Sequence, residues 1–110
     1  MNLLVDIGNT SIKFSSFVDN NLKKISQIRY SKKDLKSVTL FFKNKLKTHT
    51  KIYICSVVSE VDKVIIKNLK SHRNRLFFIN KMKLSSLVHK TVNVRQLGKD
   101  RIINVLSAIN

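Results

Sequence analysis

The chain has only two glycines, Gly8 and Gly98, whereas a protein of 110 residues usually has about eight. A chain this poor in glycine is expected to keep it where the backbone must turn tightly or approach a ligand closely. Each glycine has an aspartate two residues away, Asp6 and Asp100, and the chain has only six acidic residues. These two segments therefore carry the first predictions about fold and function.

The N-terminal third predicts three antiparallel strands. The apolar run Leu3–Ile7 ends at Gly8-Asn9, which is typical of a buried strand that enters a turn. Residues 11–18 alternate in polarity and predict a second strand, paired with the first as a hairpin. A turn signal at 19–21 separates it from a third strand over 22–30. The opening is therefore predicted to be a three-stranded antiparallel meander.

Helices and strands are predicted to alternate after this meander. A helix over 32–47 opens with the capping pattern Ser31-x-x-Asp34, and a strand at 52–55 follows. Ser59-x-x-Asp62 is expected to cap a second helix, a strand follows at 76–79, and a third helix begins near Gly98. The three apolar helix stripes are Leu35, Val38, Phe42 and Leu46; Val61, Val64, Ile65 and Leu69; and Ile102, Val105, Leu106 and Ile109.

This order predicts an α/β fold in which residues 1–110 form one domain. The last apolar stripe is still running at Asn110, so we expect the domain to be incomplete at this end. Apolar runs of at most six residues exclude a transmembrane helix, and the N-terminus lacks the basic start of a signal peptide. A single cysteine, Cys55, excludes an internal disulfide. A cytoplasmic protein is expected.

The net charge of +16 invites a nucleic-acid-binding function. The basic residues, however, are 17 lysines and 5 arginines spread from Lys13 to Arg101, without a block of five or more. This distribution favours a solvated, lysine-rich surface. The three histidines are scattered, which predicts surface positions and no metal site, while Cys55 and the pairs Phe41-Phe42 and Phe77-Phe78 are expected in the core.

The first glycine segment predicts a phosphate site. Gly8 would let the backbone approach an anion, while turn amides and the side chains of Asn9, Thr10 and Ser11 would donate to phosphate oxygens. Asp6 would hold Mg²⁺ or a metal-bound water. The alternative is an ordinary hairpin turn without a ligand. The candidate residues are Asp6, Ile7, Gly8, Asn9, Thr10, Ser11, Ile12 and Lys13.

The second glycine segment, Gly98-Lys99-Asp100-Arg101, places a carboxylate and a guanidinium at a predicted helix start. Both the helix N-terminus and Arg101 favour the ionised form of Asp100. Such a carboxylate could accept a proton from a substrate hydroxyl, while Arg101 and the terminal amides hold a polar group of the substrate. The alternative is a capping aspartate beside a surface arginine.

Together the two segments resemble motifs of the type III pantothenate kinases. The family's first strand ends in Asp-x-Gly-Asn-Thr and runs on to a Phe, as Asp6 to Phe14 do here. Residues 97–108 resemble its Gly-Ala-Asp-Arg motif, and residues 54–58 lie where the family has Ser-Ser-Val-Val. The chain departs from the pattern at Lys99, Ser59 and Thr91, where the family usually has Ala, Pro and often Tyr.

The resemblance implies a ribonuclease-H-like or actin-like (ASKHA) fold built from two domains, of which this chain would be the first. It also implies ATP-dependent phosphorylation of pantothenate to 4'-phosphopantothenate, the first step of coenzyme A synthesis, by a homodimer with Mg²⁺ and K⁺ or NH₄⁺. Residues 6–13 would bind ATP. Residues 98–101 would bind pantothenate, with Asp100 as the proton acceptor.

The resemblance further implies that the second phosphate motif, the ligand of the monovalent cation and the adenosine pocket lie beyond residue 110. The 110-residue chain alone would then be inactive. Two other readings stay open: a non-catalytic relative that acts as an accessory or transcriptional factor, and a basic nucleic-acid-binding module.

Overall fold

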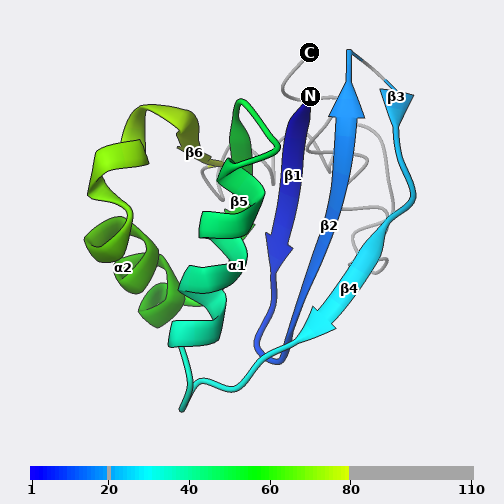
Figure 1. The fold of residues 1–110 in the computed structure, drawn as a ribbon. Coiled ribbons are helices and arrows are strands. Elements are labelled where there is room, and N and C mark those ends of the chain that lie inside the picture. Colours follow the sequence, from blue (N-terminus) through cyan, green and yellow to red (C-terminus); the bar gives the residue numbers. More distant parts are fainter. Residues whose placement is uncertain (20, 80–110) are drawn as a thin grey trace.

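Antiparallel strands open the chain, and helices alternate with strands after them (Figure 1). The computed structural model describes residues 1–19 and 21–79, so the predictions for residues 80–110, including the third helix, lie outside the described residues. The elements are β1 (Asn2–Ile7), β2 (Ser11–Val18), β3 (Asn21–Leu22), β4 (Ser26–Arg29), α1 (Lys36–Leu46), β5 (Ile52–Ser56), α2 (Ser59–Asn68), the 3₁₀ helix η1 (Lys70–Arg75) and β6 (Leu76–Phe78).

All six strands belong to one mixed sheet with the order β3-β2-β1-β5-β6, and β4 also pairs with β2. β1 is antiparallel to β2 but parallel to β5, and β5 is parallel to β6. The single third strand predicted over 22–30 is two short strands, β3 and β4, which both pair antiparallel with β2. The described chain is therefore a mixed α/β fold.

A β-bulge separates β3 from β4. Phe17 pairs with Leu22 and Phe14 with Ser26, so two residues of β2 face three residues of the other chain segment, 23–25. The Ser15 hydroxyl donates to the carbonyl of Lys23 at 2.7 Å and holds this irregular stretch against β2. The extra residue explains why one predicted strand is divided.

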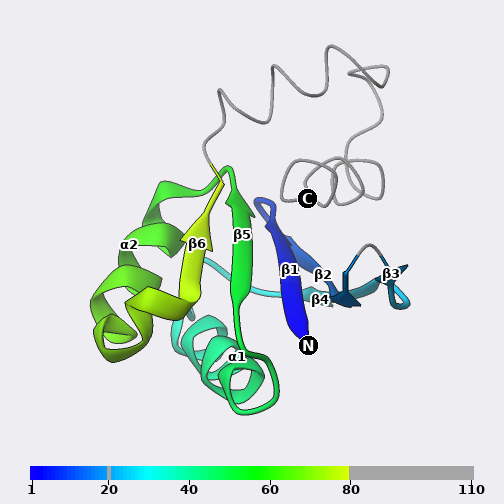
Figure 2. The same ribbon diagram turned by 90° about the horizontal axis from the view of Figure 1, so that it is seen from above.

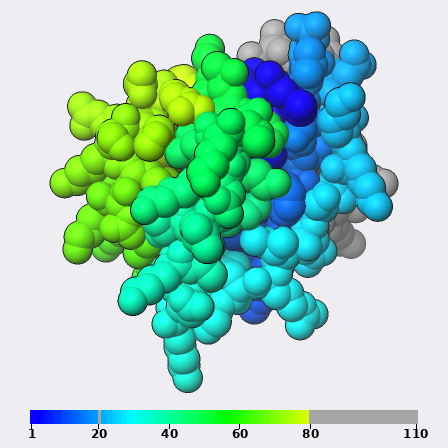
Figure 3. All heavy atoms as spheres, in the orientation of Figure 1, coloured from blue at the N-terminus to red at the C-terminus, as the bar shows by residue number. Residues whose placement is uncertain are grey.

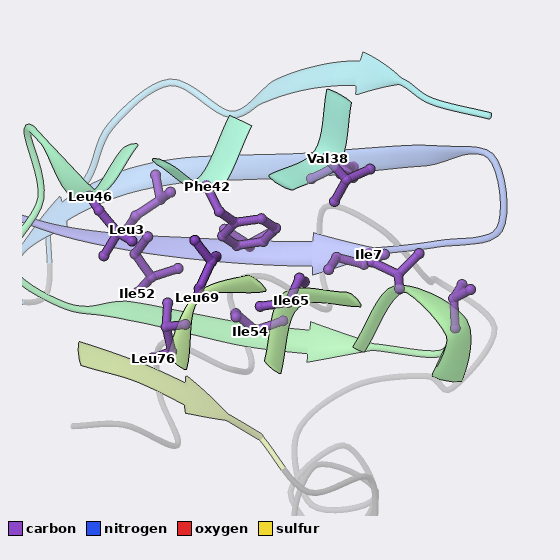
Figure 4. Packing of buried hydrophobic residues seen from close by; sticks show 14 residues of the cluster. Leu3, Ile7, Val38, Phe42, Leu46, Ile52, Ile54, Ile65, Leu69 and Leu76 are labelled. Atoms are coloured by element: carbon purple, nitrogen blue, oxygen red, sulfur yellow. The ribbon is translucent and has the colours of Figure 1, made fainter. Parts of the chain in front are cut away.

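The main core lies between the sheet and the two helices, which cover the same face (Figure 2). The space-filling view shows α1 and α2 packed against each other in front of the sheet (Figure 3). Phe42 of α1 is fully buried over the strands, and Ile65 of α2 and Leu69, just after α2, complete the layer (Figure 4). The predicted helix stripes are confirmed at Val38, Phe42, Leu46, Val61, Ile65 and Leu69, whereas the other two predicted members, Leu35 and Val64, are only half-buried.

The opposite face of the sheet is also buried. Leu4, Phe17 and Cys55 form a second, smaller cluster there, against which Tyr53 and Leu22 pack. Burial on both faces accounts for the apolar character of β1, in which residues 3–7 are all buried and Asp6 is the one polar residue among them. The prediction that Cys55 is a core residue is confirmed.

Neither predicted helix cap forms. The first helix begins at Lys36, after the N-cap residue Leu35, because the Ser31 hydroxyl accepts a hydrogen bond from the amide of Lys33 at 3.1 Å in a local turn. In α2 the N-cap is Val58, and Ser59 is the first helical residue.

Two predictions about burial are wrong. His49 is 7% exposed, because its ring lies between β2 and the end of α1, where Ser16 and the carbonyl of Lys45 bind its nitrogens. Phe77 and Phe78 are 37% and 39% exposed, because β6 is the last strand in the order of the described sheet, and Phe77, beside Tyr53, faces the side opposite the helices. Within the described ranges, no helix is both long and apolar enough to cross a membrane.

Candidate functional site

The candidate site lies at the edge of the sheet where the parallel strands β1 and β5 end. Their carboxyl ends are joined by a hydrogen bond from the Val57 amide to the Ile7 carbonyl at 3.2 Å. The β1–β2 turn, residues 8–10, projects from this edge, and α2 begins just after β5. In open α/β sheets, ligands typically bind outside the carboxyl ends of the strands.

The turn is short and tightly closed. The Gly8 amide donates to the Ser11 carbonyl at 2.9 Å, while Asn9 and Thr10 are exposed. Gly8 does not have the left-handed backbone that favours glycine, and a Cβ built on it would meet the Ser11 carbonyl oxygen at 3.5 Å, an ordinary contact. Contacts among the described residues therefore do not require glycine here.

Tyr30, just after β4, holds both flanks of the turn. Its hydroxyl donates to the Gly8 carbonyl at 2.5 Å, and its amide donates to the Thr10 carbonyl at 3.1 Å. Two residues later, the Lys32 ammonium donates to Asn9 Oδ1 at 3.1 Å. Figure 1 shows the chain passing the end of the β1–β2 hairpin as it leaves β4.

Sequence reasoning missed Tyr30 and Lys32. The pairing of Ser11 with Arg29 continues to Thr10 and Tyr30, so a correct β2–β4 register would have placed Tyr30 beside the turn. That register depends on the bulge at 23–25, for which the residue pattern carries no clear signal.

The predicted phosphate-site residues come together, but their side chains divide between the two faces. Ile7 and Ile12 are fully buried in the core beneath the helices, so only their backbone groups could reach a ligand. Asp6 and Lys13 are directly paired across β1 and β2. They alternate with Ile7 and Ile12 along the strands and so face the same side of the sheet as Leu4 and Phe17, where Asp6 is 5% exposed.

Electrostatics at this edge favour a protonated tyrosine. Burial raises the pKa of Tyr30 above its ordinary value, and the negative charges of Glu60 and Asp62 raise this pKa further. Both carboxylates lie in the first turn of α2. The Tyr30 hydroxyl therefore stays a hydrogen-bond donor to Gly8 across the physiological pH range.

Asp6 is a carboxylate at this edge that could bind a divalent cation. No group of three or more His, Cys, Asp or Glu side chains suited to a metal ion occurs among the described residues. Mg²⁺ in phosphate-transfer sites is often held by only one or two carboxylates, with water and phosphate oxygens as its other ligands. A buried carboxylate at the end of β1 fits that role.

The second predicted segment, Gly98, Lys99, Asp100 and Arg101, lies outside the described residues. Its place relative to the turn at residues 8–10 stays a prediction.

A solved structure resembles this chain in fold. It is that of a ROK family protein from Streptococcus pneumoniae TIGR4 in complex with sucrose, with a TM-score of 0.59 and 17% sequence identity. The match covers 80% of this chain and 37% of that protein. At this identity the likeness concerns the fold alone, and it supports the expected actin-like (ASKHA) architecture.

Sequence comparisons are more specific. The type III pantothenate kinase of Pelagibacter ubique (strain HTCC1062) is 31% identical over 117 residues, which cover 100% of this chain but 46% of that protein. The chain thus spans less than half the length of this relative. The sequence model of the family described as type III pantothenate kinase matches residues 2–110. The chain therefore belongs to the type III pantothenate kinase family.

Proposed function

We propose that the protein containing this chain is an ATP-dependent kinase that phosphorylates pantothenate to 4'-phosphopantothenate, the first step of coenzyme A synthesis. The observation that carries this proposal is the exposed turn at residues 8–10, where β1 ends beside β5. Membership of the family supports the same activity.

In this proposal the β1–β2 hairpin binds the phosphates of ATP. The backbone of the turn and the side chains of Asn9, Thr10 and Ser11 would donate to phosphate oxygens. Because the side chains of Ile7 and Ile12 are buried, these two residues would contribute backbone groups only. Asp6 would hold Mg²⁺ through a water molecule, and the ion would neutralise phosphate charge.

Residues 98–101 would bind pantothenate. As the primary hydroxyl of pantothenate attacks the γ-phosphorus and ADP leaves, Asp100 would accept the hydroxyl proton. Arg101 would hold a polar group of the substrate, with Gly98 and Lys99 completing the segment.

The remaining elements of the proposal come from family membership. A monovalent cation, K⁺ or NH₄⁺, would take its ligand from beyond residue 110, the enzyme would be a homodimer, and it would act in the cytoplasm. We expect duplex DNA to bind only weakly and to lose affinity steeply with salt, as a diffuse lysine-rich surface would.

Pantothenate-dependent ADP formation by the full-length gene product tests this function. We expect activity that requires ATP, Mg²⁺ and pantothenate together, and a loss of activity in Asp6→Asn. Asn21→Ala, at the exposed first residue of β3 beside the other end of β2, is the control and should keep full activity. Full-length protein that binds ATP but transfers no phosphate to pantothenate would instead favour the non-catalytic relative.

A further inference from the structure

Tyr30 contacts the phosphate-binding turn on both sides of Asn9. Its hydroxyl holds the Gly8 carbonyl at 2.5 Å, and its amide holds the Thr10 carbonyl at 3.1 Å. Tyr30 is itself half-buried and packs against the main core, so it is a fixed support. One residue therefore fixes the orientation of two peptide groups in the turn.

The orientation of a carbonyl also fixes that of the amide next to it. In a planar trans peptide, the C=O and the following N–H point in opposite directions. With the Gly8 carbonyl held toward Tyr30, the amide of Asn9 must point away from it. In an exposed turn, an amide that points away from Tyr30 is a suitable donor to an anion.

Lys32 acts on the side chain of the same residue. Its ammonium group has only donors, so it selects Oδ1 of Asn9 as the acceptor at 3.1 Å. The side-chain NH₂ of Asn9 is thereby left on the other side of the amide group. Lys32 also adds a positive charge next to the turn, which favours phosphate binding.

The donor role of Tyr30 is secured by its surroundings. A tyrosine hydroxyl is protonated at neutral pH, and burial together with the carboxylates of Glu60 and Asp62 raises the pKa of this one further. Ionised tyrosine could not donate to Gly8 and would place a negative charge beside the phosphates.

We propose that Tyr30 and Lys32 are positioning residues for ATP, which orient the main-chain and side-chain amides of Asn9 toward its phosphates. This proposal rests on the proposed function, because it assigns the turn to ATP. It adds two residues that the family motif at Asp6 to Phe14 does not contain.

The first test compares Tyr30→Phe with Tyr53→Phe in the full-length protein. Tyr53 lies on β5, where it pairs with Leu4 of β1 and stacks on Phe77 with ring centroids 5.1 Å apart. Removing its hydroxyl is the same chemical change at a different tyrosine, so Tyr53→Phe is a matched control. Loss of the Tyr30 hydroxyl should weaken MgATP binding about 3- to 10-fold by calorimetry. Adenosine binding and the KM for pantothenate should not change, and Tyr53→Phe should bind MgATP as the wild type does.

The second test removes the charge at position 32. Lys32→Gln should weaken MgATP binding by a similar factor, whereas Lys33→Gln removes the same charge one residue away and should change MgATP affinity less than twofold. Lys32→Arg keeps a donor for Asn9 and should restore most of the affinity. If arginine restores MgATP affinity, the loss in Lys32→Gln comes from the missing donor to Asn9 and not from a general loss of protein stability.

The outcomes are distinct. Wild-type MgATP affinity in both Tyr30→Phe and Lys32→Gln would overturn the positioning role while leaving the kinase function in place. An equal loss of adenosine and MgATP binding would also overturn it, because it would indicate a purely structural role. If the wild-type protein itself binds no MgATP, both the proposed function and the positioning role are wrong.

Discussion

Gly8→Ala separates the two reasons for which a glycine can occupy a turn. The added methyl group would meet the Ser11 carbonyl oxygen at 3.5 Å, which is ordinary van der Waals contact, and the backbone of Gly8 is not left-handed. At such compatible positions, replacing glycine by alanine typically stabilises a protein by about 0.4–1 kcal/mol, because the unfolded chain loses conformational freedom. We therefore expect the midpoint of thermal unfolding to stay the same or to rise by a few degrees.

Ligand binding should respond in the opposite direction. If phosphate oxygens approach the backbone of the turn closely, the same methyl group occupies space that the ligand needs. We expect MgATP affinity to fall at least about tenfold, which corresponds to about 1.4 kcal/mol. The predicted signature is thus a protein that is as stable as the wild type and yet deficient in nucleotide binding.

Calorimetric titration with MgATP and thermal unfolding followed by circular dichroism measure the two effects on the same full-length samples. Asn21→Ala, an exposed substitution near the turn at the other end of β2, should leave MgATP affinity unchanged. Wild-type affinity in Gly8→Ala would refute the close approach of phosphate to this turn. A large loss of stability would refute the argument that glycine is not required by the fold.

Three further predictions concern stability and chemistry. Burial lowers the pKa of His49, despite its hydrogen bond to the Lys45 carbonyl. Below pH about 6.5, the unfolded chain therefore takes up a proton more readily than the folded chain does, and the free energy of unfolding falls. Urea unfolding at pH 7.5 and 5.5 should show this loss in the wild type but much less of it in His49→Gln. Phe42→Ala should cost about 3–5 kcal/mol in urea unfolding, because the ring is fully buried. In the full-length enzyme, Asp100→Asn should lower turnover by roughly 100-fold while MgATP affinity is retained, as steady-state kinetics and titration would show.

The periodicity of apolar residues predicted the core, because apolar side chains at helical spacing lie on one face of the helix and that face is buried. The spacing of Val38, Phe42 and Leu46 places all three on one helix face, and each is buried against the sheet. The ends of the helices were less predictable. Ser31 could either cap a helix or close a local turn, and the structure takes the local turn. Periodicity records which face is buried but does not decide between such competing hydrogen bonds.

Tertiary contacts account for the predictions about single residues that were wrong. His49 looks like a surface residue because its neighbours are Thr48 and Thr50, both of which are exposed. Its burial depends on Ser16, whose hydroxyl lies 2.7 Å from Nε2 and comes from a strand more than thirty residues earlier. No local pattern reports a contact across such a separation. The turn at residues 8–10 was predictable because the pair Gly8-Asn9 after an apolar run is a turn signal within the local sequence.

The bulge between β3 and β4 explains why the support of that turn was harder to predict than the turn itself. Leu22 packs on the cluster around Phe17, whereas Ile28 and Tyr30 pack on the main core beneath the helices. These residues are separated by even numbers of positions, so an unbroken strand would place them all on one face. A register without the extra residue would also pair Thr10 with Arg29 instead of Tyr30.

One additional residue within 23–25 therefore does two things. It turns the side chain of Tyr30 to the face of the sheet that carries the main core, and it brings the Tyr30 amide to the Thr10 carbonyl. The same shift places Tyr30 within reach of the Gly8 carbonyl and near the carboxylates at the start of α2. A local irregularity in an edge segment thus sets the geometry of the turn at the opposite end of β2, where the phosphates of ATP are proposed to bind.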